Sequence, residues 1–117
     1  MTRILITGIG GFTGYYAAAT FSERDHEVHG IVHQGGAANI PGVQRLFEAD
    51  LVDHSAVTKI AEDVRPDYVL HLAGIAFVAH SDVDQIYRSN VIGTRQLLDA
   101  LTGLKTPPRS IILASKI

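Results

Sequence analysis

The chain has 117 residues, with 12 acidic and 10 basic side chains and a formal net charge of −2 at pH 7. Hydrophobic residues make up 46% of the chain and charged residues 19%, which excludes a disordered or collagen-like protein. The sequence has no basic stripe for nucleic acid and no apolar run long enough for a membrane span, and without cysteine it has no disulfide, thiolate metal site or cysteine nucleophile.

The first predicted elements are a strand over Arg3 to Thr7 and a helix over Thr13 to Arg24, joined by a glycine-rich turn. Glycine has no Cβ to obstruct an anion, and the positive end of the helix dipole attracts negative charge. The order strand, glycine turn, helix therefore predicts a dinucleotide site. Its cofactor-binding residues are expected to include Gly8, Gly10, Gly11, Phe12, Thr13 and Gly14.

The spacing of the glycines indicates which kind of dinucleotide site this is. Gly8, Gly11 and Gly14 follow G-x-x-G-x-x-G, whereas the commoner G-x-G-x-x-G fails because position 13 is threonine. The alternative is a glycine turn in an α/β domain that binds nothing, and the flanking strand and helix count against it.

A second strand is predicted over Val28 to Val32, followed by a loop over Gln34 to Gly42 that is rich in glycine. The residue that reads the cofactor ribose lies at the end of this strand in dinucleotide-binding domains, which here is His33. An acid would favour NAD, and its absence favours NADP. The alternative is that His33 is an ordinary residue at a strand end.

A third strand is predicted over Gln44 to Glu48 and a helix over His54 to Asp63. Asp50 and Leu51 lie between them, where an adenine is expected to bind. Asp50 is predicted to accept a hydrogen bond from the adenine amino group. It is equally suited to cap the following helix, as Asp53 is.

The fourth strand is predicted over Tyr68 to Leu72, with the small-residue turn Ala73-Gly74 at its carboxyl end. This end is the ligand edge of an open α/β sheet, so Leu72, Ala73 and Gly74 are predicted to approach the cofactor. For His71, an internal hydrogen bond is favoured over a catalytic role.

A long helix is predicted over Asp84 to Leu101, capped by Gly103, and a fifth strand over Ser110 to Ala114. Asn90, inside that helix, is expected to hydrogen-bond the backbone of the fourth strand.

The alternation of strands and helices predicts a Rossmann-like, doubly wound α/β fold with a parallel sheet, truncated after the fifth strand. In the strand order 3-2-1-4-5-6, the run Ile111 to Leu113 would lie on an open edge, so we expect self-association. A flavodoxin-like or receiver-like domain is the weaker alternative, because a receiver needs clustered acids where this chain has Thr7-Gly8.

Together, these motifs resemble the extended short-chain dehydrogenase/reductase family, the NAD-dependent epimerase/dehydratase group that acts on nucleotide sugars. The matching residues are Thr7-Gly8-x-x-Gly11-x-x-Gly14, Asp50-Leu51, His71-Leu72-Ala73-Gly74 and Asn90-Val91-x-Gly93-Thr94. Within the family, Val28 to Val32 resembles the second strand of GDP-mannose dehydratases. The stretch from His71 to Leu98 resembles GDP-6-deoxy-4-keto-mannose reductases.

The resemblance implies that the three glycines hold pyrophosphate, that Asp50-Leu51 holds adenine and that Ala73 with Gly74 lies at the nicotinamide side. It also implies that Asn90 belongs to the active-site architecture, that the helix around Asp84 to Leu101 pairs between subunits of a homo-oligomer, and that a nucleotide sugar is the substrate. We further expect a cytoplasmic protein.

The departures from the family concern catalysis. The family's base is a tyrosine followed four residues later by a lysine, and this chain has no such pair. Ser115 is a poor catalytic candidate, because the usual hydroxyl residue would be at position 116, where this chain has lysine. Residues 1–117 are therefore expected to be the NAD(P)-binding part of a larger enzyme, without the substrate domain and inactive alone. The alternative is a non-catalytic NADP-binding sensor or regulatory domain.

Overall fold

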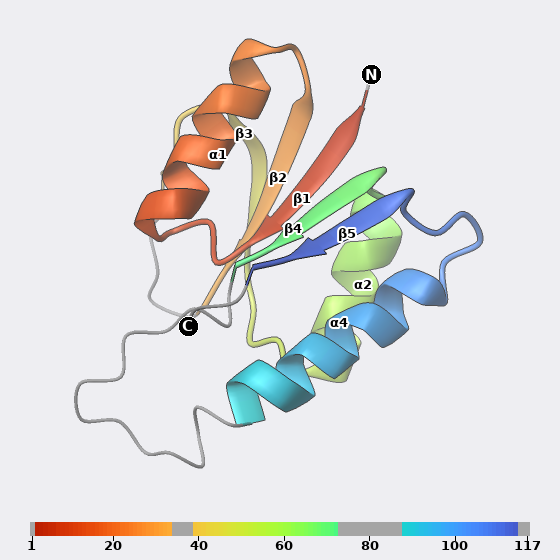
Figure 1. Ribbon diagram of the computed structural model, residues 1–117. Coiled ribbons are helices and arrows are strands. Elements are labelled where there is room, and N and C mark those ends of the chain that lie inside the picture. The colour runs from red at the N-terminus through yellow and green to blue at the C-terminus, as the bar shows by residue number, and fades with distance from the viewer. Residues whose placement is uncertain (1, 34–38, 73–87, 115–117) are drawn as a thin grey trace, which may run out of the picture.

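The computed structural model describes residues 2–33, 39–72 and 88–114 (Figure 1). Its strands are β1 (Arg3–Thr7), β2 (Glu27–Val32), β3 (Val43–Glu48), β4 (Tyr68–His71) and β5 (Ser110–Leu113). Its helices are α1 (Phe12–Glu23), α2 (His54–Val64) and α4 (Gly93–Thr102), and a π-helical turn, η1 (Arg88–Ile92), leads into α4.

In the described part of the chain, five parallel strands form one sheet in the order β3-β2-β1-β4-β5. Figure 1 shows α1 on one face of this sheet and α2 with α4 on the other. The doubly wound α/β prediction is therefore confirmed. The order also excludes a flavodoxin-like or receiver-like arrangement, in which the sheet runs 2-1-3-4-5.

The middle of the central strand β1, Ile4 to Ile6, is apolar and buried because both faces of the sheet are covered. Ile4 and Ile6 pack in the cluster beneath α1, whereas Leu5 packs in the cluster beneath α2 and α4. Both clusters are formed by buried aliphatic side chains. The alternation of side chains along β1 thus joins two cores through one strand.

Of the helices that cover the second face, α2 agrees with its predicted bounds to within one residue, whereas α4 begins nine residues after the predicted start. One apolar face of α2 is buried, and the helix stops where Arg65 adopts φ +48° ahead of Pro66. The predicted long helix is interrupted, since η1 precedes α4; positions 84–87 of that prediction lie outside the described residues. Gly103 does follow α4 as its cap residue, but with φ −79° it is not the left-handed cap for which glycine is usually needed.

At the β5 edge of the sheet, Ile112 and Leu113 are 59% and 50% exposed. These are large apolar side chains on a strand with a single neighbour, β4, in the described sheet. The predicted open edge is thus present in the described part of the chain, while self-association stays a prediction.

Candidate functional site

The predicted glycine turn joins β1 to α1 at the carboxyl edge of the sheet. Gly8 adopts φ +69°, a left-handed conformation that favours glycine, and its N–H donates to the carbonyl of Ile31 at 3.1 Å. The N–H of Gly11 then donates to the carbonyl of Gly8 at 3.1 Å, which closes the turn.

Gly14 is required for close packing of α1 on the turn. A Cβ at this position would lie 2.6 Å from Cα of Ile9 and 2.8 Å from the carbonyl oxygens of Gly8 and Ile9. Such distances are well inside van der Waals contact, so the third glycine of the motif is a packing residue.

Gly11 differs from its two partners because the fold itself does not require a glycine there. It is exposed, its φ of −81° suits any residue, and a Cβ would meet only the carbonyl oxygen of Gly8 at an ordinary 3.6 Å. A side chain at position 11 would extend into the solvent in front of the N-terminus of α1.

The N-terminus of α1 presents backbone donors to that same space. No side chain caps the helix, its first turn has no acid, and the first intrahelical hydrogen bond runs from the N–H of Tyr15 to Gly11. Among the described residues, no acceptor is recorded for the N–H groups of Phe12, Thr13 and Gly14. Three unpaired N–H groups at the positive end of a helix dipole form an anion-binding arrangement.

The sheet brings the other predicted residues to this edge as well. His33 directly follows β2 and is exposed, and Asp50 lies two residues beyond β3 and is also exposed. Leu51 and Leu72 are buried, at 8% and 6% exposure. Ala73 and Gly74 lie outside the described residues, as does Ser115.

The structure shows which of the two aspartates, Asp50 or Asp53, caps α2. Asp53 caps α2, because its Oδ1 accepts from the N–H of Ala56 at 3.2 Å. Asp50 instead accepts from the N–H of Val52 at 3.1 Å, and its carbonyl accepts from the N–H of Asp53 at 2.9 Å. The alternative reading, in which Asp50 caps the helix, is therefore excluded, and the adenine role of Asp50 stays a prediction.

His71 forms a buried hydrogen-bond chain beneath the glycine turn. Its Nδ1 lies 2.6 Å from Oγ1 of Thr7 and its Nε2 lies 2.8 Å from Oγ1 of Thr94, so one ring joins β1, β4 and α4. The Thr7 hydroxyl also accepts from the N–H of Leu72 at 3.1 Å. The internal role predicted for His71 is confirmed, and burial lowers the pKa of its imidazole, which favours the neutral ring.

Asn90 lies in the π-helical turn η1, a feature often found at functional sites. Its Oδ1 is buried and has no hydrogen-bond partner in the described part of the chain. This oxygen therefore does not form the predicted hydrogen bond with the backbone of β4.

Two glycines for which the sequence analysis predicted no packing role shape the site from behind. A Cβ at Gly30 in β2 would lie 2.6 Å from Cδ1 of Ile9, so this glycine lets the turn residue Ile9 pack on the sheet. A Cβ at Gly93 would lie 3.0 Å from Cβ of Leu51, so α4 approaches the predicted adenine segment closely. A glycine inside a strand signals close approach, and Gly30 is recognisable in the sequence for that reason.

Fold and site together define a parallel, doubly wound nucleotide-binding α/β domain. The family model described as "NAD dependent epimerase/dehydratase family" matches residues 4–116, and the chain belongs to that family.

Individual relatives agree with the family. The chain is 36% identical over 112 residues to GDP-mannose 4,6-dehydratase of Vibrio cholerae serotype O1, with 83% of this chain and 30% of the relative covered. The crystal structure of UDP-glucose 4-epimerase from Brucella ovis in complex with NAD matches with a TM-score of 0.86 and 27% identity, over 98% of this chain and 36% of that one. The UDP-glucose 4-epimerase of Thermotoga maritima, solved with UDP-glucose, matches with a TM-score of 0.84 and 27% identity, over 97% of this chain and 38% of that one. The chain thus spans about a third of the length of these relatives.

None of the helices in the described ranges is long and apolar enough to cross a membrane. The predicted cytoplasmic location stays a prediction.

Proposed function

We propose that this chain is the cofactor-binding part of a nucleotide-sugar epimerase, dehydratase or reductase that uses NAD or NADP. Family membership and the similarity to GDP-mannose 4,6-dehydratases support the substrate class. The observation that carries the cofactor role is the open N-terminus of α1 behind the exposed Gly11, a position where the fold does not need a glycine but a closely approaching phosphate does.

Each part of the dinucleotide has a proposed partner on the carboxyl edge of the sheet. The N–H groups of the first turn of α1 hold the pyrophosphate, and the turn glycines leave room for it. His33 lies beside the ribose next to the adenine, Asp50 and Leu51 hold the adenine, and Leu72 with Ala73 and Gly74 faces the nicotinamide side.

In the whole enzyme, bound NAD or NADP would accept a hydride from a sugar carbon or return one to it. This chain's residues position that cofactor and exclude water from its pyrophosphate, and none of them is assigned a proton transfer. The tyrosine and lysine that perform proton transfer in the family have no counterpart within the 117 residues. We therefore expect the chain alone to bind a dinucleotide without turnover.

Calorimetric titration of the 117-residue chain with NAD and with NADP tests the proposal. We expect saturable binding of at least one dinucleotide, and the preferred one settles the choice that His33 leaves open. Gly11→Asp should weaken binding by about a hundredfold or more, because a carboxylate then faces the pyrophosphate across a short distance. Gly11→Ala is the matched control for the fold, since its Cβ has only ordinary contacts.

Two results would contradict the proposal. One is a folded wild-type chain that binds neither dinucleotide, and the other is a Gly11→Asp variant that binds as tightly as the wild type.

A second candidate function is a non-catalytic NADP-binding sensor or regulatory domain. Both candidates predict cofactor binding. Incubation of the whole protein with NAD(P) and a GDP-sugar separates them, because only the enzyme changes the absorbance of the reduced cofactor or converts the sugar.

We also propose that the protein forms a homo-oligomer. The resemblance to the family, in which the helix around Asp84 to Leu101 pairs between subunits, supports this proposal. Light scattering after size-exclusion chromatography measures the oligomeric state, and a monomer at all concentrations would refute the proposal.

A further inference from the structure

The strand order of the sheet reverses between β1 and β4, because β2 and β3 follow on one side of β1 whereas β4 and β5 follow on the other. In an open α/β sheet, a dinucleotide binds across the carboxyl ends of the strands at such a switch point. The residues that end the two strands, Thr7 and His71, are register partners, and both are buried. A titratable imidazole therefore lies at the switch point, beneath the edge where we propose that the cofactor binds.

Both nitrogens of the His71 ring contact hydroxyl groups. Nδ1 lies 2.6 Å from Oγ1 of Thr7, and Nε2 lies 2.8 Å from Oγ1 of Thr94. A neutral imidazole needs one donor and one acceptor, whereas a protonated imidazole needs two acceptors. A hydroxyl group can donate or accept, so rotation of the hydroxyl hydrogens satisfies the ring in either state. The contacts of His71 therefore permit both charge states without movement of the backbone.

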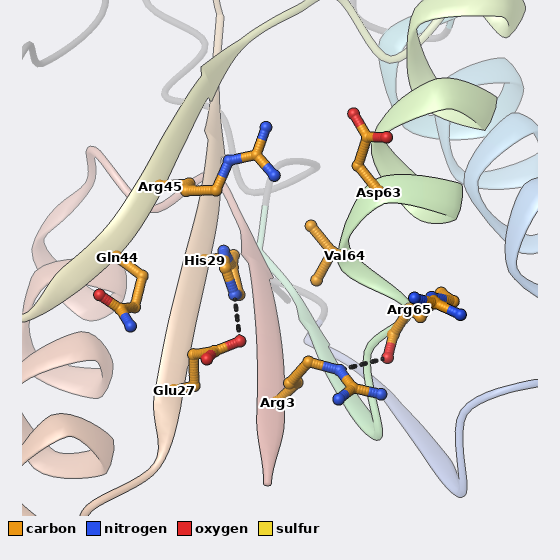
Figure 2. Close-up of a pocket in the computed structure, with 8 residues that line it drawn as sticks. All are labelled: Arg3, Glu27, His29, Gln44, Arg45, Asp63, Val64 and Arg65. Atoms are coloured by element: carbon orange, nitrogen blue, oxygen red, sulfur yellow. Dashed lines mark hydrogen bonds and ion pairs between the residues drawn. The ribbon is translucent and has the colours of Figure 1, made fainter. Parts of the chain in front are cut away.

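The other buried histidine in the described part of the chain, His29, lies in a different environment. Its Nε2 lies 2.8 Å from Oε2 of Glu27, so an acid is its partner. Figure 2 shows this pair in a cavity of ≈ 410 Å³ that Arg3 and Arg45 also line. Arg3 is the first residue of β1, at the opposite end of the strand from the glycine turn. Of the two buried histidines, only His71 lies at the cofactor edge.

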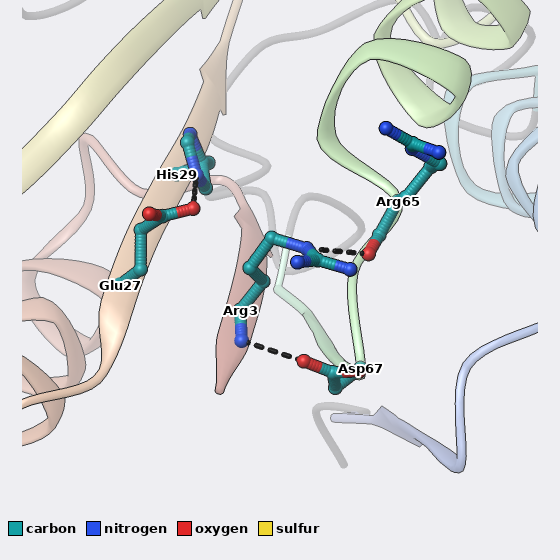
Figure 3. A network of polar contacts seen from close by, with 5 residues as sticks. All are labelled: Arg3, Glu27, His29, Arg65 and Asp67. Carbon is teal, nitrogen blue, oxygen red and sulfur yellow. Dashed lines mark hydrogen bonds and ion pairs between the residues drawn. The ribbon is translucent and has the colours of Figure 1, made fainter. Parts of the chain in front are cut away.

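Among the described side chains, no charged group acts on the His71 ring. Arg3 of β1 lies at the far end of the strand, where its backbone N–H donates to the carboxylate of Asp67 at 2.8 Å, just before β4 (Figure 3). Strand β5 has no charged residue, and on α4 the exposed side chains of Arg95 and Asp99 pair with each other at 3.9 Å. Burial is accordingly the cause that lowers the pKa of His71. The charge of a bound cofactor would therefore act on this ring without competition from the described side chains.

The two redox states of a nicotinamide dinucleotide differ in charge at one ring. Oxidised nicotinamide has a positive charge and reduced nicotinamide has none, while the adenosine and the pyrophosphate are the same in both. The residue that reads the ribose of the adenosine follows β2, so the adenosine half lies on the β2 side of the switch point. The nicotinamide half then lies on the β4 side, at the strand that His71 ends.

We propose, on the basis of the cofactor function proposed above, that His71 makes the relative affinity for oxidised and reduced nicotinamide dinucleotide depend on pH. The imidazolium form of His71 repels the positive ring of the oxidised cofactor, whereas the neutral ring of the reduced cofactor meets no such repulsion. A lower pH therefore favours the reduced form. Because linkage is reciprocal, the reduced cofactor also favours the protonated imidazole more than the oxidised cofactor does.

Calorimetric titrations of the 117-residue chain with NAD and with NADH, from about pH 8 to about pH 5, test the proposal. NADP and NADPH replace them if the chain prefers the phosphorylated pair. We expect the ratio of the dissociation constants, oxidised over reduced, to rise by about threefold as the pH falls. The rise should occur below pH 6.5, because burial lowers the pKa of His71 from that value. Groups on the adenosine side, such as His33, act on both redox forms alike and cancel in the ratio.

A second measurement follows the ring itself and needs no variant. NMR signals of the His71 imidazole, recorded against pH in each complex, give the pKa of the ring with the oxidised and with the reduced cofactor. We expect the pKa to be higher in the complex with the reduced cofactor. A purely structural role for His71 predicts the same pKa in both complexes.

Two variants provide a matched comparison. His71→Gln keeps a side chain that can form hydrogen bonds but removes the titrating ring, and should make the ratio of dissociation constants independent of pH. His54→Gln removes a histidine from the exposed start of α2, where Nδ1 lies 2.7 Å from Oε1 of Gln96. This variant should show the same pH dependence of the ratio as the wild type.

The outcomes separate this proposal from the cofactor function. If the wild type binds both redox forms with a ratio that is constant, or that falls as the pH falls, the role of His71 is refuted while the cofactor function stands. The same holds for equal pKa values in the two complexes, or for a pH-dependent ratio that persists in His71→Gln. If a folded chain binds no dinucleotide, the cofactor function fails, and the role of His71 fails with it.

Discussion

Helices α1 and α2 both begin at the carboxyl edge of the sheet, yet their first turns are completed in opposite ways. In α2, the side chain of Asp53 accepts a backbone N–H of the first turn. In α1, the residue at the same position is Gly11, and no side chain accepts any N–H of the first turn. One helix start is closed by its own chain and the other is open.

The difference has an energetic meaning. A side-chain cap stabilises a helix by about 1 kcal/mol relative to alanine, and α1 does without it at a position where aspartate or serine would fit. Folding stability alone does not explain why α2 has a side-chain cap and α1 lacks one, whereas a bound ligand at α1 would explain it. A phosphate that completes the first turn of α1 is such a ligand.

The largest expected effect on stability comes from adding a side chain at Gly14, where α1 packs against the glycine turn. Gly14→Ala should destabilise the domain by about 2–3 kcal/mol, because its Cβ would lie 2.6 Å from Cα of Ile9 and the turn must shift. Urea unfolding measures the change. Gly11→Ala is the control and should cost far less, since its Cβ has ordinary contacts; equal losses in both variants would show that the two glycines do not differ in role.

The next effect concerns the closed helix. Asp53→Ala should lower the free energy of unfolding by about 1 kcal/mol, because the N–H of Ala56 loses its acceptor. Asp53→Asn keeps an acceptor oxygen and should retain most of the stability. Dinucleotide binding should be the same in both variants. A loss of binding in Asp53→Ala would mean that the α2 start also belongs to the cofactor site.

The stability of the ligand-free chain is expected to rise by about a few tenths of a kcal/mol when α1 is given a capping side chain like that of α2. Gly11→Asp should stabilise the ligand-free chain slightly, because the new carboxylate caps α1 as Asp53 caps α2. The same variant is expected to lose dinucleotide binding. Higher stability together with lost binding is the opposite of a folding defect, and paired urea and calorimetry measurements distinguish them. Lower stability of Gly11→Asp would break the comparison.

The smallest expected effect is the pH dependence of stability that the buried side chain of His71 contributes. Burial lowers the pKa of His71 below its ordinary 6.5, so the unfolded chain binds this proton more readily than the folded one. The contribution of the neutral ring is complete above pH 6.5 and is lost as the pH falls through that value toward the lowered folded pKa. Urea unfolding on both sides of pH 6.5 should show this loss.

The matched variants for this pH dependence are His71→Gln and His54→Gln. The first should flatten the pH dependence of stability, whereas the second, at an exposed residue, should preserve it. The same slope in His71→Gln and the wild type would assign the titration to another group.

Much of the fold was predictable because its signals are local. The strands β1 and β2 are short apolar runs, and α2 has an apolar stripe that ends before Pro66. The interruption of the long helix by η1 was not predictable, because the sequence from Arg88 to Ile92 contains no glycine or proline that would break a helix.

The candidate site divides in the same way. The turn from Gly8 to Gly14 was recognisable, since its glycines lie between a strand and a helix. The choice between Asp50 and Asp53 as the helix cap was not, because both residue types suit that position and only the backbone path places one oxygen 3.2 Å from the N–H of Ala56.

By itself, the sequence determined the doubly wound α/β class, the glycine turn and its family, because these follow from periodicity and from residues close together in the chain. The tertiary structure decided that Thr7, His71 and Thr94 share one hydrogen-bond chain, and that Arg3 and Arg45 face one cavity. Such groupings depend on which strands are neighbours and on the register between them. A single bulge at Gln44 changes which side chains lie next to each other, and local residue propensities do not predict such a bulge.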